Sequence, residues 1–194
     1  MTPIAFIIGN GRSRLDIDLE SLRGRGMIYG CNALYRDFEP DVLIATDSGI
    51  AKEIQNTGYA KRKPFYTRRP IEGLGARQIQ YNYGWSSGQV ALSHACHSNH
   101  HYLYMLGFDL AGLDNNQKFN NVYADSNHYK TSKDKATFYG NWLKQIMETA
   151  LEFKQCRFIR VIQPESYVPV ELDKLKNFQH MSISEFKTVL NTMK

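Results

Sequence analysis

The chain has 194 residues, of which 42% are hydrophobic and 22% are charged, and it carries a formal net charge of +5 at pH 7. This composition is typical of a globular protein and excludes a disordered or collagen-like chain. The longest apolar runs are only strand-sized, so we expect no membrane span, and we see no secretion signal at the N-terminus. The positive charge favours an anionic partner, without choosing between a nucleotide, a nucleic acid and a membrane surface.

Short apolar runs predict the strands. A parallel strand covered on both faces reads as a near-continuous apolar stretch. Runs of this kind occupy residues 4–8, 27–31, 42–46, 102–106 and 157–162, and residues 64–67 are a further candidate.

Segments whose apolar residues recur with the period of an α-helix separate these runs. The clearest covers residues 133–154, where apolar side chains recur at three- and four-residue steps and Ser132 can serve as the N-cap. We also expect a buried helix at 88–98 and an amphipathic helix at 183–193, opened by Ser182 or Ser184. The alternation predicts an α/β fold over residues 1–194: a single Rossmann-like, doubly wound, mostly parallel sheet with helices on both faces.

Two long polar segments, 68–86 and 110–131, fit neither pattern. Loops of this length in a compact domain usually have a function, so we expect them to act as active-site or lid loops. The three cysteines are odd in number and widely spaced, with no C-x-x-C motif. They predict reduced thiols and a cytoplasmic protein rather than a disulfide framework.

The first predicted strand runs directly into a turn with two glycines, an amide and two arginines. Ligands of open α/β sheets bind beyond the carboxyl ends of the strands, where glycines and free N–H groups admit a phosphate. The turn matches neither the full G-x-G-x-x-G nor the P-loop pattern. It therefore predicts a phosphate site, with a plain tight turn as the alternative, made by Gly9, Asn10, Gly11, Arg12 and Ser13.

Other predicted strands deliver polar groups to the same edge. Asn32 follows the second strand and can read a base or a sugar, whereas Asp47 follows the third and can hold a ribose hydroxyl or a metal. Asp109 follows the strand at 102–106. The start of the helix at 88 offers free N–H groups to an anion. The residues at that start are Ser86, Ser87 and Gly88.

The segment 123–129 supplies candidate catalytic groups. The hydroxyls of Tyr123 and Tyr129 can hold a phosphate, and His128 is the natural acid or base near neutral pH. A histidine group at 94–101 lacks an accompanying carboxylate, so it does not favour a metal site. The basic runs at 61–63 and 68–69 leave nucleic acid as an alternative partner that the sequence does not favour.

Several motifs in this order resemble a known family. The stretches "IIGNGRS", "IYGCNALY", "SSGQVALSHACHSNHHYLYMLGFDL", "DSNHY" and "VIQPES" look like the collinear motifs of bacterial lipooligosaccharide sialyltransferases. The resemblance implies metal-independent binding of a CMP-sugar, with Tyr123 and Tyr129 at the phosphate. It also implies a set of residues around the nucleotide: Asn10, Gly11, Asn32, Ser87 and Gly88.

The sequence departs from that family at the base. The resemblance places the family's histidine at Thr131 or Ser132, so either His128 substitutes for it or the chemistry differs. The stretch Glu39–Asp47 instead resembles archaeal 6-hydroxymethylpterin diphosphokinases and motility accessory factors. That resemblance implies Mg²⁺ on ATP held by Asp47, with Asp109 as a second ligand.

Three hypotheses follow from the sequence. The first is a glycosyltransferase that needs no cofactor, uses a CMP-sugar-like donor and modifies an unknown acceptor. The second is a Mg²⁺-dependent pyrophosphokinase, and the third is a nucleotide- or glycan-binding protein without catalysis. Because the lid is short, a second subunit of a homo-oligomer could complete the site.

Overall fold

The strands of the structure, a computed structural model that describes residues 3–193, form one parallel sheet. Their order across the sheet is β5-β4-β3-β2-β1-β6-β7-β8. The strands are β1 (Ile4–Ile8), β2 (Met27–Cys31), β3 (Val42–Ala45), β4 (Phe65–Thr67), β5 (Arg77–Gln78), β6 (Tyr102–Leu106), β7 (Arg157–Ile162) and β8 (Phe178–Ser182). Every adjacent pair is parallel.

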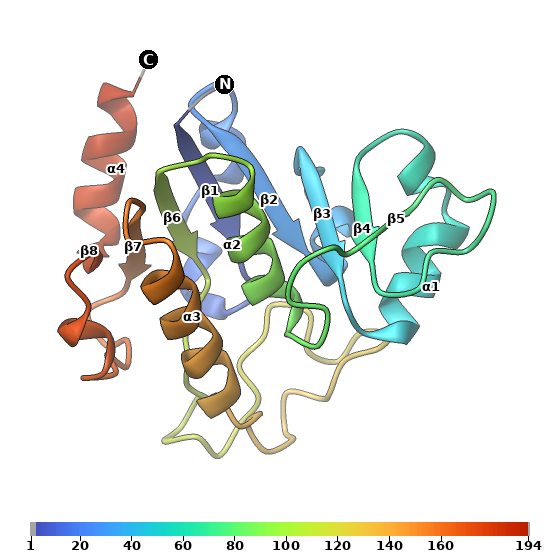
Figure 1. Cartoon of the computed structure of the whole chain (residues 1–194). Helices are drawn as coiled ribbons and strands as arrows, with labels where there is room; N and C mark the ends of the chain where they lie inside the picture. Colours follow the sequence, from blue (N-terminus) through green and yellow to red (C-terminus); the bar gives the residue numbers. More distant parts are fainter. Residues whose placement is uncertain (1–2, 194) are drawn as a thin grey trace.

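Helices cover both faces of this sheet (Figure 1). They are α1 (Ser48–Asn56), α2 (Ser87–His97), α3 (Gly140–Glu152) and α4 (Ile183–Thr192). Alternate residues of β1 define the two faces: Phe6 and Ile8 pack in the core under α1 and α4, and Ala5 and Ile7 pack in the core under α2 and α3. The predicted fold class is therefore confirmed.

The apolar runs place most strands correctly. The predictions at 4–8, 27–31, 102–106 and 157–162 agree with the structure to the residue, and those at 42–46 and 64–67 are one residue too long. The predicted helices at 88–98 and 183–193 are α2 and α4. Ser182 caps α4 in a capping box with Glu185, as the sequence pattern indicates.

The predicted helix at 133–154 is wrong in its first turns. The helix α3 begins at Gly140 after Tyr139, and Ser132 caps nothing. Instead the backbone N–H of Ser132 donates to Asp125 Oδ1 at 3.0 Å, and the carbonyl of Asp134 accepts from the N–H of Phe119 at 2.7 Å. These contacts hold residues 133–139 in the loop, because tertiary partners satisfy backbone groups that a helix would have used.

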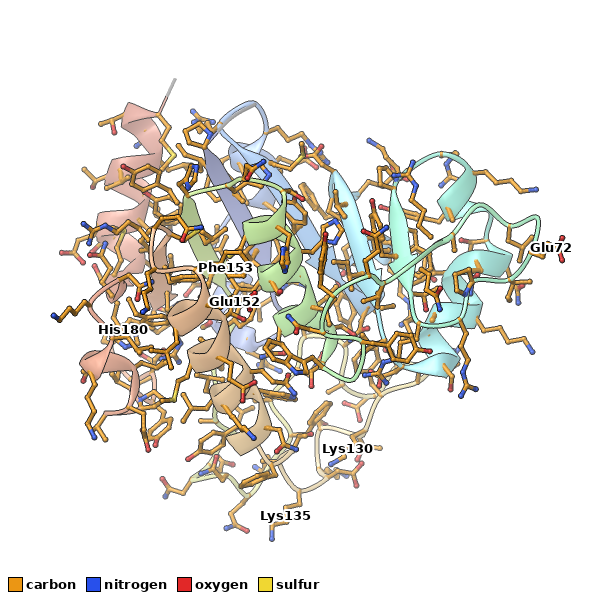
Figure 2. All side chains as sticks on the ribbon, in the orientation of Figure 1. Glu72, Lys130, Lys135, Glu152, Phe153 and His180 are labelled. Carbon is orange, nitrogen blue, oxygen red and sulfur yellow. The ribbon has the colours of Figure 1, made fainter. Side chains whose placement is uncertain are left out.

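Strands β2 to β5 follow one another on one side of β1, whereas β6 to β8 follow one another on its other side, so the order switches between β1 and β6. In open α/β sheets this switch point opens a crevice beyond the carboxyl ends of the strands. The segment from β6 to α3 passes below these ends, and Figure 2 shows Lys130 and Lys135 projecting from it. Short 3-10 turns complete the described elements at Arg12–Asp16, Leu19–Leu22, Asn32–Arg36, Tyr59–Lys61 and Leu172–Lys174.

Two further expectations concern cysteines and membranes. The three cysteines are free and buried. Within residues 3–193, every helix is too short or too polar to cross a membrane.

Candidate functional site

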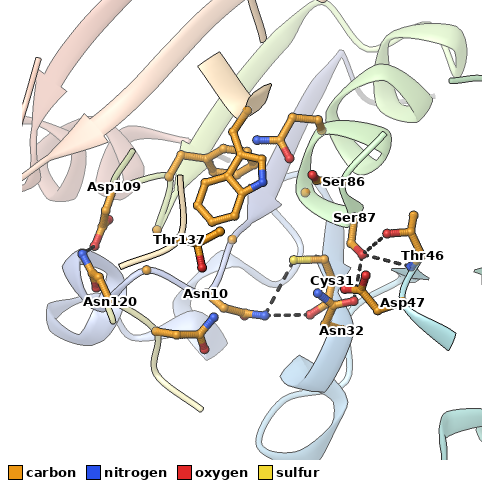
Figure 3. Close-up of a pocket in the computed structure, with 18 of the residues that line it drawn as sticks. Asn10, Cys31, Asn32, Thr46, Asp47, Ser86, Ser87, Asp109, Asn120 and Thr137 are labelled. Carbon is orange, nitrogen blue, oxygen red and sulfur yellow. Dashed lines mark hydrogen bonds between the residues drawn. The ribbon is translucent and has the colours of Figure 1, made fainter. Parts of the chain in front are cut away.

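A cavity of about 470 Å³ lies beyond the carboxyl ends of β1, β2, β3 and β6, at the start of α2 (Figure 3). We call it the first cavity. Most of the residues that the sequence singled out line it, although they come from six separate parts of the chain. They are Gly9, Asn10, Gly11, Asn32, Asp47, Ser86, Ser87, Gly88, Asp109, His128 and Tyr129. Their meeting at one edge is a finding of the structure, whereas their roles stay predictions.

Hydrogen bonds tie the strand ends together around this cavity. The hydroxyl of Ser87 accepts the backbone N–H of Thr46 at 2.9 Å and donates to Asn32 Oδ1 at 2.8 Å. Asn10 Nδ2 donates to the carbonyl of Cys31 at 3.1 Å. Asn32 has a φ of +53°, a left-handed conformation that asparagine adopts more readily than most residues. The cavity wall is therefore held in place before any ligand binds.

The glycine turn after β1 serves a different purpose from the predicted one. The N–H of Gly9 donates to the carbonyl of Leu106 at 2.7 Å, and that of Gly11 donates to the carbonyl of Gly107 at 2.9 Å. A Cβ at Gly9 would lie 2.6 Å from the oxygen of Gly107. The glycines thus let two turns of the protein approach each other, and their N–H groups are not free for a phosphate.

Replacing Gly9 by alanine is expected to destabilise the protein by about 1–3 kcal/mol, the usual cost of overpacking a rigid site. Chemical denaturation of the variant measures this loss. Gly84→Ala is the matched control, because Gly84 also lines the cavity but has open space where its Cβ would be. Equal stability of the two variants would contradict the proposed packing role of Gly9.

The arginines of that turn do not reach the first cavity. Arg12 is exposed, and its backbone N–H donates to Asn120 Oδ1 at 3.1 Å. Arg14 is buried, and its Nη2 donates to the hydroxyl of Tyr123 at 3.2 Å. Ser13 bonds to Asp109 through both its N–H and its hydroxyl. Arg12 and Ser13 are not among the residues that line the first cavity, and their contact with a ligand stays a prediction.

Other groups supply positive potential to the first cavity. Ser86 is the N-cap of α2, and its side chain makes no capping bond, which leaves the first turn of this helix open to an anion. Arg68 and Lys130 also line the cavity. Arg68 extends from the end of β4, and its Nε and Nη2 donate to the carbonyls of Tyr83 and Trp85 at 2.6 and 2.7 Å. A guanidinium therefore lies beside the turn that precedes α2.

The two predicted phosphate-binding tyrosines have different surroundings. The hydroxyl of Tyr129 lines the cavity and accepts the N–H of Ala33 at 3.2 Å, so its proton remains available to a ligand oxygen. Burial raises the pKa of Tyr129, which keeps it protonated at neutral pH. Tyr123 is only 7% exposed, lies outside the cavity lining and bonds to Arg14. Tyr123 packs against Tyr129, with ring centroids 5.8 Å apart, and its contact with a phosphate stays a prediction that the cavity lining does not favour.

His128 lines the first cavity and pairs with a carboxylate that the sequence did not reveal. Its Nε2 lies 3.0 Å from Glu53 Oε2. Burial raises the pKa of Glu53, but hydrogen bonds from Tyr35 and Arg36 outweigh this, and the net pKa is lowered. Glu53 is therefore ionised at neutral pH and orients the imidazole ring. The other nitrogen, Nδ1, lies against Gly49, where a Cβ would come within 2.6 Å of it.

The carboxylates of Asp47 and Asp109 both line the first cavity. Both oxygens of Asp109 accept hydrogen bonds from the protein, from the N–H and hydroxyl of Ser13 and from Asn120 Nδ2. The side chain of Asp47 makes no capping bond to the start of α1. In the part of the chain that the structure describes, no three His, Cys, Asp or Glu side chains are grouped to hold a metal. Asp109 is thus held by protein donors, and Mg²⁺ bound by Asp47 and Asp109 stays a prediction.

The histidines at the end of α2 pack against aromatic rings. The ring centroid of His94 lies 4.5 Å from that of Tyr66, and His97 stacks on Tyr81 at 3.6 Å. Since α2 begins at the first cavity, its last turn lies at the far end of the helix. These side chains serve the core and its edge.

Comparisons with known proteins show a similarity of fold. No protein-family model and no curated protein matches the chain. Among solved structures, it is similar to the sialyltransferase CstII from Campylobacter jejuni, in complex with a substrate analogue, cytidine-5'-monophosphate. The sequence identity is 15%, the TM-score is 0.47, and the similarity covers 86% of this chain and 81% of that chain. A likeness at this level concerns the fold, and no statement about a ligand follows from it.

Proposed function

We propose that the chain binds a nucleotide-sugar of the CMP-sugar type in the first cavity and transfers its sugar to an acceptor. The observation that carries this proposal is the meeting of an uncapped helix start, two cations and an oriented histidine on one cavity. The volume of about 470 Å³ suits a ligand of this size. The collinear motifs that resemble the sialyltransferases support the choice of nucleotide.

The first turn of α2 and the nearby Arg68 and Lys130 would receive the phosphate of the nucleotide. Trp142 and Phe108 give the cavity an aromatic wall on which a base can stack. Asn32 and Asp47 lie on the β2 and β3 side, where a ribose or base edge can exchange hydrogen bonds with them. In this arrangement the sugar would lie toward His128.

Transfer of the sugar leaves a phosphate with additional negative charge. The helix start and the Tyr129 hydroxyl can stabilise that charge, since they are fixed by the fold before the reaction. His128 would accept the proton of the acceptor hydroxyl, and Glu53, 3.0 Å from its Nε2, would orient the ring. A base oriented by a carboxylate is a recurring arrangement in group-transfer enzymes. The sugar–phosphate bond breaks and the bond from the acceptor oxygen forms, without a metal in the step.

Calorimetric titration with CMP, CDP and ATP, each with and without Mg²⁺, tests the proposal. Metal-independent binding of the cytidine nucleotides is the expected result. Binding of ATP alone, and only with Mg²⁺, would replace the proposal by the pyrophosphokinase hypothesis. Cytidine binding without hydrolysis or transfer of a CMP-sugar would favour a protein that binds its ligand without catalysis.

Asn32→Asp is expected to weaken CMP binding at least tenfold, or about 1.4 kcal/mol, because the carboxylate cannot donate the amide hydrogen bond to the ribose or base and adds negative charge to a site for an anion. Aspartate tolerates the left-handed backbone at this position, so the fold should persist. Asn99→Asp is the matched control, since Asn99 has a φ of +62° and is exposed outside the cavity. Equal affinity of both variants for CMP, measured by calorimetry, would locate the nucleotide elsewhere.

A further inference from the structure

A second cavity of about 580 Å³ adjoins the first. It lies between α1, the ends of β3 and β4 and the beginning of the 68–86 segment. The two cavities share four lining residues, Thr46, Asp47, Arg68 and Gly84. A ligand in the second cavity would therefore lie next to a ligand in the first, with Asp47 and Arg68 at the boundary.

The second cavity carries more positive than negative charge, since Asp47 is the one carboxylate among its described lining residues. Lys52, Arg68 and Arg69 line it, and within residues 3–193 none of the three takes part in an ion pair. The start of α1 also lies at this cavity, and its N-cap, Asp47, makes no side-chain capping bond. Three cations against the single carboxylate of Asp47 leave a net positive field that attracts an anion.

The wall of the second cavity is built before a ligand arrives. Gln55 is 2% exposed, and its Oε1 accepts the N–H of Ile71 at 2.6 Å while its Nε2 donates to the carbonyl of Arg69 at 3.4 Å. This buried amide fixes the turn after β4 to α1. On the other side, Arg68 holds the carbonyls of Tyr83 and Trp85. A cavity fixed on both sides loses little entropy when it binds a ligand.

We propose that the second cavity binds the acceptor, and that this acceptor is a sugar carrying a carboxylate or a phosphate. The inference rests on the proposed function, because the nucleotide-sugar occupies the first cavity. Lys52 and Arg69 would hold the acidic group of the acceptor, and its hydroxyl would point across Asp47 toward the donor. Neutral acceptors would lack the charge that these side chains recognise.

Titration of the ¹⁵N-labelled full chain with glucuronate, glucose 6-phosphate and glucose tests this inference. Both anionic sugars are expected to shift the backbone amide signals of Lys52, Arg69 and Ile71, and the stronger of the two identifies the acidic group. Glucose should leave these signals in place. Equal shifts with glucose, or shifts from none of the three sugars, would overturn the inference.

The double variant Lys52→Gln/Arg69→Gln is expected to bind the anionic sugar at least tenfold more weakly while it keeps the wild-type affinity for CMP. Lys187→Gln, an exposed change on α4, is the control. Unchanged binding of the sugar by the double variant would overturn the inference. If the protein binds CMP but the anionic sugars do not shift the amide signals, the acceptor site alone is overturned. If the anionic sugars shift the signals but CMP does not bind, the proposed function is overturned and the anion site is retained.

Discussion

Replacing Arg160 by methionine is expected to lower the free energy of unfolding by about 3–5 kcal/mol, because three backbone carbonyls lose charge-assisted hydrogen bonds. Arg160 is 1% exposed, and its guanidinium donates to the carbonyls of Phe108, Asp109 and Tyr167 at 2.7 to 2.9 Å. Burial lowers the pKa of Arg160 to about 10, so it remains cationic at neutral pH. Methionine fills a similar volume but offers no donor to these oxygens.

Urea denaturation measures this effect, and Arg157→Met is the matched control. Arg157 belongs to the same strand, β7, but its side chain is exposed. The control should change the free energy of unfolding by no more than about 0.5 kcal/mol, as exposed substitutions usually do. A loss below about 1 kcal/mol in Arg160→Met would contradict the prediction and mean that water hydrogen-bonds to these carbonyls in place of the guanidinium. Because Phe108 and Asp109 line the first cavity, the destabilised variant should also bind CMP more weakly.

Replacing His128 by asparagine is expected to lower turnover at least about 100-fold, the usual contribution of a general base. Asparagine is the suitable replacement, because His128 has a φ of +71° and asparagine tolerates that backbone. The affinity for CMP should stay within about threefold, since the proposed nucleotide contacts lie on α2, β2 and β3. Steady-state transfer or hydrolysis of a CMP-sugar, together with calorimetry, checks both values.

Glu53→Gln is the companion variant, with an expected loss of at least about tenfold in turnover, because a neutral amide stabilises the charged imidazole less well. Glu152→Gln, an exposed change at the end of α3, is its control. Turnover that is unchanged in both His128→Asn and Glu53→Gln would remove this pair from the mechanism.

Strand positions followed from the sequence wherever both faces of a strand are covered. Burial on both sides demands continuous apolar runs, and β1, β2, β6 and β7 carry them. The prediction missed β8 and β5, which lie at the two edges of the sheet. Polar residues such as Gln179 and His180 interrupt β8, and both residues of β5 are exposed. An edge strand needs fewer apolar side chains, so an apolar run does not identify it.

The convergence of the site residues could also be predicted, because parallel strands end at one edge of a sheet. The direction of individual side chains could not. Glu53 belongs to α1, a helix that the prediction did not include, and it lies one helical turn beyond Gly49, which leaves room for the His128 ring. That spacing of four residues was the available signal. Arg68 was recognised as basic, but only the fold brings it beside the start of α2.

The pairing of β1 with β6 has a consequence for synthesis on the ribosome. Ile4 to Ile8 pair with Tyr102 to Leu106, so the middle of the sheet joins segments from distant parts of the chain. Such non-local contacts form late, because a long loop must close before they can stabilise the fold. A nascent chain that has emerged only as far as β4 exposes one bare edge of β1. This edge stays unpaired until β6 has been translated.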